Sequence, residues 1–274
     1  MLKARLITAA ILLPLVIGAI VFLPTLYIEI ISGVFFALAT WEWVCLMGFA
    51  EQWKKICIFV LFLLIAGLCY YARIPIEWVC WTSLGWWLIG LLAISFFPKG
   101  RAIWKQTWLQ LLIGCFMLIP AWLVLSSLHA DSNFGPLWVL LCCALIWGAD
   151  TGAYFSGKKW GQNKLLATVS PGKTWEGFYG ALGTGVILTG LFYVLTNPNY
   201  SFILLLWVCI LTVLFSVIGD LVESLFKRVQ GIKDSGGLLP GHGGVLDRLD
   251  SMLSAFPIFV LGLKLLENIQ LTPF

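Results

Sequence analysis

Cations, carboxylates and glycines are concentrated in one segment of this apolar chain, residues 224–250, which reads SLFKRVQGIKDSGGLLPGHGGVLDRLD. Charged side chains are costly near a membrane, so a dense mixed-charge segment in such a chain indicates a functional site. Carboxylates suit a metal ion, and cations suit phosphate groups. The segment therefore predicts a combined metal and phosphate site, with these candidate residues: Lys227, Arg228, Lys233, Asp234, His242, Asp247, Arg248 and Asp250.

Three aspartates have a spacing that suits a shared metal ion. Asp247 and Asp250 are three residues apart, so they lie on one face of the helix expected to begin there. Asp220 lies on the preceding apolar segment, which a hairpin would bring alongside. A carboxylate at a helix N-terminus can also act as a cap, which is a simpler explanation for one of the pair. Together the three predict a Mg²⁺ site, with one ion or with a second cation beside it.

The remaining polar groups of the segment suit phosphate binding. Arg side chains can bind a phosphate through two hydrogen bonds, and Lys side chains bind it as a point charge. Gly243 and Gly244 would let backbone amides approach an anion. Asp234 would orient a lysine or a second cation. The cations expected to hold phosphates are Lys227, Arg228, Lys233 and Arg248.

The apolar segment before the loop ends in a polar stripe. Asp220, Glu223, Ser224 and Lys227 have the spacing of one helix face. Glu223 and Lys227 are four residues apart and are explained by an ordinary ion pair along a helix. Asp220 lies deeper in the apolar segment and has no cation one turn away, so it is the better candidate for a functional group.

Two upstream segments carry further candidates. Asp150 lies at the inner end of another apolar segment, on the side where residues 224–250 are expected. Lys173 belongs to the sequence Ser-Pro-Gly-Lys-Thr, residues 170–174, which resembles the end of a phosphate-binding loop. Such a loop requires a buried strand before it, and no strand is predicted there, so we reject that interpretation. Ser170 or Thr174 would instead cap the next helix, and Lys173 would hold a phosphate.

The composition indicates an integral membrane protein. Of 274 residues, 61% are hydrophobic and only 11% are charged, whereas soluble domains have about 25% charged residues. This excludes an ordinary soluble domain, because one soluble core could not bury so much apolar surface. The eight cysteines lie in apolar runs without metal-type spacing, and there are two histidines, which argues against a zinc site.

The apolar runs predict an all-α polytopic fold with about nine transmembrane helices. If the N-terminus is cytoplasmic, nearly all Lys and Arg residues fall on the cytoplasmic side, as the positive-inside rule requires. The region 224–250 then faces the cytoplasm, where nucleotides are available. The predicted spans are 6–24, 26–47, 56–72, 79–97, 108–128, 137–156, 177–196, 202–222 and 251–268.

The two parts of the chain differ in polar content. Residues 1–136 are expected to form N-terminal transmembrane helices, and residues 137–274 a C-terminal transmembrane catalytic region with the segment 224–250. Glu29 and Glu42 lie in the second predicted span. Each would line a cavity, lie at an interface or pair with a neighbouring helix, and the sequence leaves these alternatives open.

The segment 224–250 resembles the signature of the phosphatidate cytidylyltransferases, which are also called CDP-diacylglycerol synthases. Its fixed positions match without departure, so the resemblance is specific, although residues before about 136 match only in being membranous. Two upstream segments, 150–154 and 170–177, are also similar to the family. The matching positions are Ser224, Lys227, Arg228, Lys233, Asp234, His242, Gly243, Gly244, Asp247, Arg248 and Asp250.

The resemblance implies a reaction in which CTP and phosphatidic acid give CDP-diacylglycerol and pyrophosphate. It also implies Mg²⁺, a homodimer and the cytoplasmic (inner) membrane of a bacterium. His242 would contact a phosphate or satisfy backbone groups of its loop. The resulting assignments are Lys227, Arg228, Lys233, Asp234, His242 and Arg248 as catalytic residues, Asp150, Ser170, Lys173, Ser224, Gly243 and Gly244 as substrate-binding residues, and Asp220, Asp247 and Asp250 as metal ligands.

Two other functions are compatible with parts of the pattern. A CTP-dependent kinase of lipid alcohols would also use CTP at a membrane, but the complete signature favours cytidylyl transfer. A transporter would place charges near the middle of the bilayer and often shows paired repeats. Here the charges gather at one face and in the second half of the chain, which disfavours transport.

Overall fold

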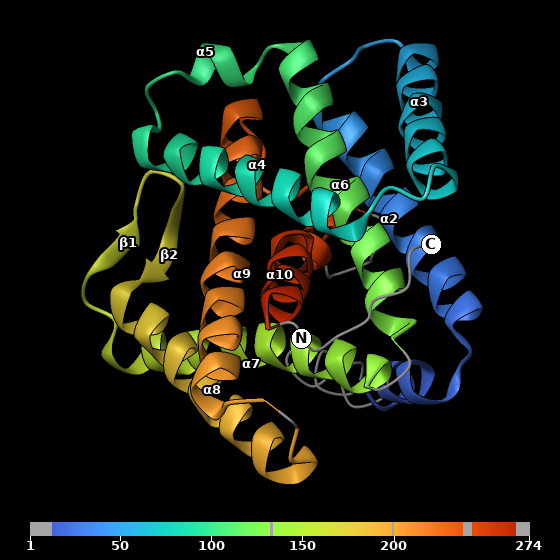
Figure 1. Ribbon diagram of the computed structural model, residues 1–274. Coiled ribbons are helices and arrows are strands. Elements are labelled where there is room, and N and C mark those ends of the chain that lie inside the picture. Colours follow the sequence, from blue (N-terminus) through green and yellow to red (C-terminus); the bar gives the residue numbers. More distant parts are fainter. Residues whose placement is uncertain (1–12, 132–133, 199, 238–242, 267–274) are drawn as a thin grey trace.

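The computed structural model describes residues 13–131, 134–198, 200–237 and 243–266 and consists mainly of helices (Figure 1). Long apolar runs form helices because a helix satisfies its own backbone hydrogen bonds where no water is available. A shorter apolar helix covers Leu13–Phe22. The other helices are α2 (Thr25–Leu46), α3 (Gln52–Tyr71), α4 (Ile76–Phe96), α5 (Arg101–Trp104), α6 (Thr107–His129), α7 (Gly135–Trp160), α8 (Trp175–Thr196), α9 (Phe202–Gln230) and α10 (Leu246–Leu265).

The helices confirm a polytopic membrane protein. In the described part of the chain, seven helices are long and apolar enough to cross a bilayer, and they correspond to the second to eighth predicted spans. The ninth predicted span coincides with most of α10, whose first turns carry charged residues. The first predicted span overlaps the helix Leu13–Phe22, and its beginning lies outside the described residues.

Helix α10 occupies the centre of the molecule (Figure 1). It packs against α9 and also contacts α2, α4, α6 and α7. Most of its side chains after the first turns are buried, including Phe256 and Phe259. Because α10 is fixed on several sides, its N-terminal turns have a defined position beside the inner part of α9.

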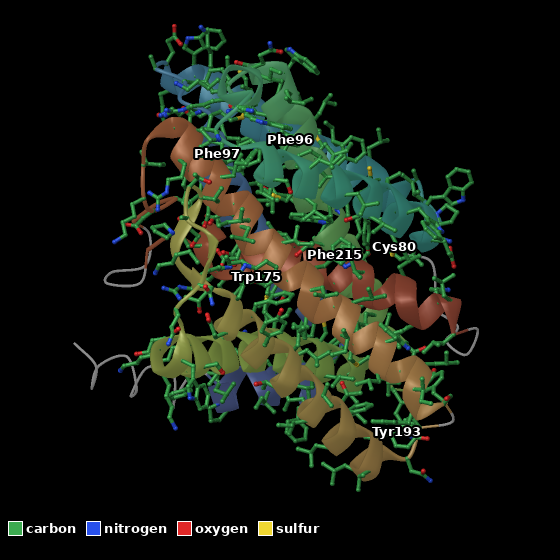
Figure 2. The ribbon with its side chains drawn as sticks, turned by 90° about the vertical axis from the view of Figure 1, so that its left-hand side faces the viewer. Cys80, Phe96, Phe97, Trp175, Tyr193 and Phe215 are labelled. Carbon is green, nitrogen blue, oxygen red and sulfur yellow. The ribbon has the colours of Figure 1, made fainter. Side chains whose placement is uncertain are left out.

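Helices α7 and α8 pack closely and border the same region. Helix α8, which carries Trp175 and Tyr193, also contacts α9 (Figure 2). A side chain at Gly148 or Gly152 of α7 would overlap residues of α8, and one at Gly180 of α8 would overlap α7. These glycines therefore allow the two helices to approach closely.

A small antiparallel hairpin is the part of the fold that the sequence did not predict. Strand β1 (Lys164–Leu166) pairs with β2 (Ser170–Thr174), where the sequence indicated only a polar connection. Val169, in the turn of the hairpin, is fully buried and anchors it to the helices. Thr174 then caps α8, since its hydroxyl accepts a hydrogen bond from the amide of Gly177 at 3.1 Å. The predicted cap is confirmed, and Lys173 lies on β2.

Candidate active site

Three carboxylates come together where α9 meets α10. Asp220 and Glu223 lie one turn apart on α9, and Asp250 lies on α10. One oxygen from each lies within 4.8 Å of the others. Asp220 and Asp250 were both predicted as metal ligands, and the structure brings them together. Glu223 is the addition, because the sequence suggested only an ion pair for it.

Glu223 does form that ion pair, and it is fully buried. Its carboxylate pairs with Lys227 one turn later on α9. Its Oε1 has no hydrogen-bond partner among the described residues. A buried carboxylate oxygen without a partner is costly, and a bound cation would remove that cost. Burial and the nearby Asp220 also raise the pKa of Asp250, at the start of α10, well above its ordinary value. The cluster therefore has the chemistry of a cation site.

Asp247 does not belong to this cluster in the described structure, because loop and helix groups surround its carboxylate. Lys227 Nζ lies 2.8 Å from its Oδ1, and the amide of Gly244 donates to its Oδ2 at 2.8 Å. The amide of Ser235 lies 3.2 Å from both oxygens. Burial would raise the pKa of Asp247, but its interactions with Glu223, Lys227 and the Gly244 amide outweigh burial and lower that pKa to about 2. Asp247 is thus a charged group that closes the loop onto α10.

A second lysine reaches the cluster from the hairpin. Lys173 Nζ lies 2.6 Å from Asp220 Oδ2. The hydroxyl of Ser224 donates to the other oxygen of Asp220 at 3.3 Å. The polar stripe predicted on one helix face is therefore real, and the hairpin adds a cation to it. The sequence had placed Lys173 in the site but could not indicate its partner.

A cavity of about 430 Å³ adjoins the acidic cluster. It is lined by residues of α7, α8, α9 and the hairpin, and Asp150, Lys173 and Asp220 contribute its charged groups together with Lys158. Asp150 was predicted to face the same side as the segment 224–250, and its place in this wall agrees with that prediction. The size and mixed polarity of the cavity suit a phosphorylated small molecule or a lipid headgroup.

The other predicted residues lie around this centre. Arg228 donates from Nε to the carbonyl of Val169 at 3.2 Å and so ties the hairpin to α9. Lys233, Asp234 and Arg248 are exposed on the loop and the first turn of α10, and Ser170 begins β2. His242 lies outside the described residues. Gly243 has a φ of +79°, a conformation that favours glycine, next to the Gly244 amide that Asp247 binds.

The sequence assigned no place in the site to two functional candidates, Glu223 and Glu42. For Glu223, the ion pair with Lys227 four residues later was a sufficient explanation. Its spacing of three residues from Asp220, which puts both carboxylates on one helix face, was the signal for a shared site. Glu42 lies far away in the sequence, and no spacing rule connects it to the loop. In the structure its carboxylate accepts hydrogen bonds from Ser235 and from Leu246 at the start of α10.

The fold and the site define a multi-pass membrane protein with a lysine-flanked acidic centre. The chain matches the cytidylyltransferase family over residues 3–266 and belongs to that family, which confirms the predicted resemblance and its class of enzyme. It is 38% identical over 260 residues to a phosphatidate cytidylyltransferase of Pseudomonas aeruginosa, an alignment that covers 94% of this chain and 96% of that protein. A phosphatidate cytidylyltransferase of Haemophilus influenzae is 35% identical over 285 residues, with 94% and 97% covered.

Proposed function

We propose that this protein is a phosphatidate cytidylyltransferase, which converts CTP and phosphatidic acid into CDP-diacylglycerol and pyrophosphate. The observation that carries the proposal is the cluster of Asp220, Glu223 and Asp250 beside a cavity that also holds Lys173. Relatives that bear this name align with nearly the whole chain, which supports the same substrates.

The reaction needs positioning and charge neutralisation more than proton transfer. An oxygen of the phosphatidic acid phosphate attacks the α-phosphorus of CTP, and the bond to the β-phosphate oxygen breaks. The new phosphorus–oxygen bond joins the lipid to CMP, and pyrophosphate leaves with the electron pair. The attacking phosphate is already anionic, so no strong base is required. The protein must align two anions that repel each other, which is the task of its cations.

The acidic cluster is the proposed Mg²⁺ site. Asp220, Glu223 and Asp250 would hold the ion, which when bound would neutralise charge on the CTP phosphates. The prediction that Asp247 is also a ligand stays a prediction, because its oxygens contact Lys227 and two loop amides in the structure. A second cation also remains a prediction.

The cations around the cluster are the proposed phosphate ligands. Lys173 lies beside the cavity and next to Asp220, so it is best placed to hold a phosphate there. Ser224 and Asp150 complete the polar wall of this side of the site, and the exposed loop cations would meet substrates that arrive from the aqueous side. The remaining proposed contributors are Ser170, Lys227, Arg228, Lys233, Asp234, His242, Gly243, Gly244 and Arg248.

The proposed topology places this site on the cytoplasmic face of a bacterial inner membrane. Nine spans with a cytoplasmic N-terminus put nearly all Lys and Arg residues on that side, where CTP is present. Phosphatidic acid would reach the cavity from the adjoining leaflet. As the family resemblance implies, the protein would act as a homodimer.

Incubation of the purified protein with α-³²P-labelled CTP, phosphatidic acid and Mg²⁺ tests the proposal. Label should pass into a chloroform-soluble product while pyrophosphate is released in equal amount. Reactions without phosphatidic acid, or with diacylglycerol in its place, are the controls. If the label stays entirely in CDP while a lipid alcohol becomes phosphorylated, the protein is a kinase and the proposal is wrong.

A further inference from the structure

Glu42 is a buried carboxylate of α2 that contacts the segment 224–250 directly. Its side chain is only 3% exposed. Its Oε2 accepts a hydrogen bond from the amide of Leu246 at 2.8 Å and one from the hydroxyl of Ser235 at 3.1 Å. Leu246 is 204 residues further along the chain. A helix of the first half of the protein thus holds the loop that precedes α10 at Ser235 and at the point where the helix begins.

The contact with Leu246 acts as a helix cap supplied from another helix. Leu246 is the first residue of α10, and its amide has no acceptor within the helix. Val245, the residue before it, offers no side-chain cap. Glu42 fills this role with a carboxylate, which the positive end of the helix dipole also favours. The point at which α10 begins is therefore set by Glu42.

At two glycines, the loop backbone lies directly against this carboxylate. A side chain at Gly236 would overlap Glu42, with the added Cβ 2.7 Å from Glu42 Cδ, and its three nearest atoms all belong to Glu42. A side chain at Gly244 would overlap both Glu42 and Ser235. By contrast, a Cβ at Gly237 would have no atom within 4 Å among the described residues. The loop backbone thus approaches Glu42 at the positions where a side chain is missing.

Glu42 and Asp247 hold the same loop from two sides. Asp247 binds the amides of Ser235 and Gly244, while Glu42 binds the Ser235 hydroxyl and the amide of Leu246. Asp247 itself is the second residue of α10. A shift of the helix start would therefore move Asp247, and with it the carboxylate of Asp250 one turn later.

We infer that Glu42 is a positioning residue of the active site. Among the described residues it is neither a member of the acidic cluster nor part of the cavity lining, but it holds the loop at Ser235 and fixes the start of the helix that carries Asp247 and Asp250. The inference rests on the proposed function for its effect on catalysis. Its effect on the loop can be measured without any assay of activity.

Hydrogen–deuterium exchange on the full-length protein in detergent tests the loop contact. In Glu42→Ala, the amide of Leu246 should exchange about tenfold faster, because its acceptor is lost. The amides of Ser235 and Gly244 should also exchange faster, because a shift of the helix start displaces Asp247, their acceptor. Glu42→Gln, which keeps an acceptor oxygen, should lie between this variant and the wild type. Glu29→Ala on the same helix is the matched control and should leave these amides unchanged. Unchanged exchange in Glu42→Ala would overturn the inference, whether or not the protein makes CDP-diacylglycerol.

The Mg²⁺ concentration needed for half-maximal activity shows whether Glu42 positions the site or only supports folding. Groups that orient metal ligands typically change metal affinity or activity about 10–100-fold. Glu42→Ala should raise the Mg²⁺ concentration for half-maximal activity by this factor, with partial recovery in Glu42→Gln. A lower maximal rate at an unchanged Mg²⁺ requirement would mean that Glu42 only supports folding, and would contradict the positioning role.

A double-mutant cycle tests the contact even if Glu42→Ala folds poorly, because it compares the effect of Gly236→Ala in two backgrounds. Gly236→Ala should lower activity strongly in the wild type, because the three atoms nearest to its new Cβ all belong to Glu42. In the Glu42→Ala background the same change should add little, since the obstructing side chain is gone. Gly237→Ala, one residue later, is the matched control and should have little effect in either background. Equal effects of Gly236→Ala in both backgrounds would contradict the inference.

Discussion

Lys227 lies between two carboxylates that belong to different helices, Glu223 of α9 and Asp247 of α10. Its Nζ is 2.8 Å from Asp247 Oδ1 and also pairs with Glu223. All three side chains are buried or nearly so. Lys227 therefore joins the two helices that carry the acidic cluster, and it offsets the charge of Glu223. Because Lys227 is already paired with two carboxylates, it has a structural function in addition to the predicted catalytic one.

Lys227→Met should destabilise the protein and abolish most activity. Breaking a buried pair by removing one partner leaves an uncompensated charge and costs about 3–5 kcal/mol. Thermal unfolding in detergent should show a clear fall in the midpoint. Lys54→Met is the matched control, since Lys54 pairs with Glu51 at 3.0 Å on the surface. That pair should contribute at most about 1 kcal/mol. Equal shifts in the two variants would show that Lys227 has no special place between the helices.

Metal titration should distinguish Glu223 from Asp247. If the cluster of Asp220, Glu223 and Asp250 holds the ion, Glu223→Gln should weaken Mg²⁺ or Mn²⁺ binding about tenfold or more. Asp247→Asn should weaken it less, because Asp247 contacts Lys227 and loop amides instead. Mn²⁺ binding followed by electron paramagnetic resonance measures both without a reaction. Stronger loss in Asp247→Asn would support the ligand set predicted from the sequence.

The sequence predicted most of the membrane helices because each is a long apolar run, and a bilayer permits few alternatives to a helix. It also placed Asp220 and Asp250 together, because a hairpin of two helices is a local arrangement. The strands Lys164–Leu166 and Ser170–Thr174 were missed because they are short and have no alternating apolar pattern. Their position depends on the burial of Val169 and on the hydrogen bond from Arg228, which are tertiary contacts.

Glu42 illustrates the larger limit of sequence reasoning. A lone glutamate in an apolar span is compatible with a cavity, an interface or a partner helix, and only the fold selects among them. Here the selection came from the packing of α2 near the start of α10. The glycines at 236 and 244 belong to the glycine-rich segment 224–250, but the group that requires them lies in the other half of the chain.

Acid should weaken the fold through Asp247 within a defined pH range. The pKa of Asp247 is lowered from an ordinary value of 3.8 to about 2, so its ionised form is favoured in the folded protein. This contribution is complete above about pH 4 and is lost as the pH falls towards 2. It corresponds to about 2 kcal/mol. In a metal-free buffer with chelator, the wild type should lose more thermal stability between pH 4 and 2 than Asp247→Asn. Parallel curves for the two proteins would contradict the assigned interactions.

The contact between α7 and α8 should tolerate no side chain at Gly180. An added Cβ would overlap Ser156 and would lie 2.7 Å from the carbonyl oxygen of Gly152, which is backbone and cannot rotate away. The two helices must separate to admit it, and such overpacking costs about 1–3 kcal/mol. Gly183→Ala on the same helix is the matched control, because no atom lies within 4 Å of its Cβ position. Alanine there should leave the unfolding midpoint unchanged or raise it slightly, since a helix favours alanine over glycine.

Because α7 and α8 also line the cavity with Asp150 and Phe178, Gly180→Ala should in addition raise the KM for substrate, whereas Gly183→Ala should not. Equal midpoints and equal KM values in the two variants would show that the helices are not in close contact at Gly180.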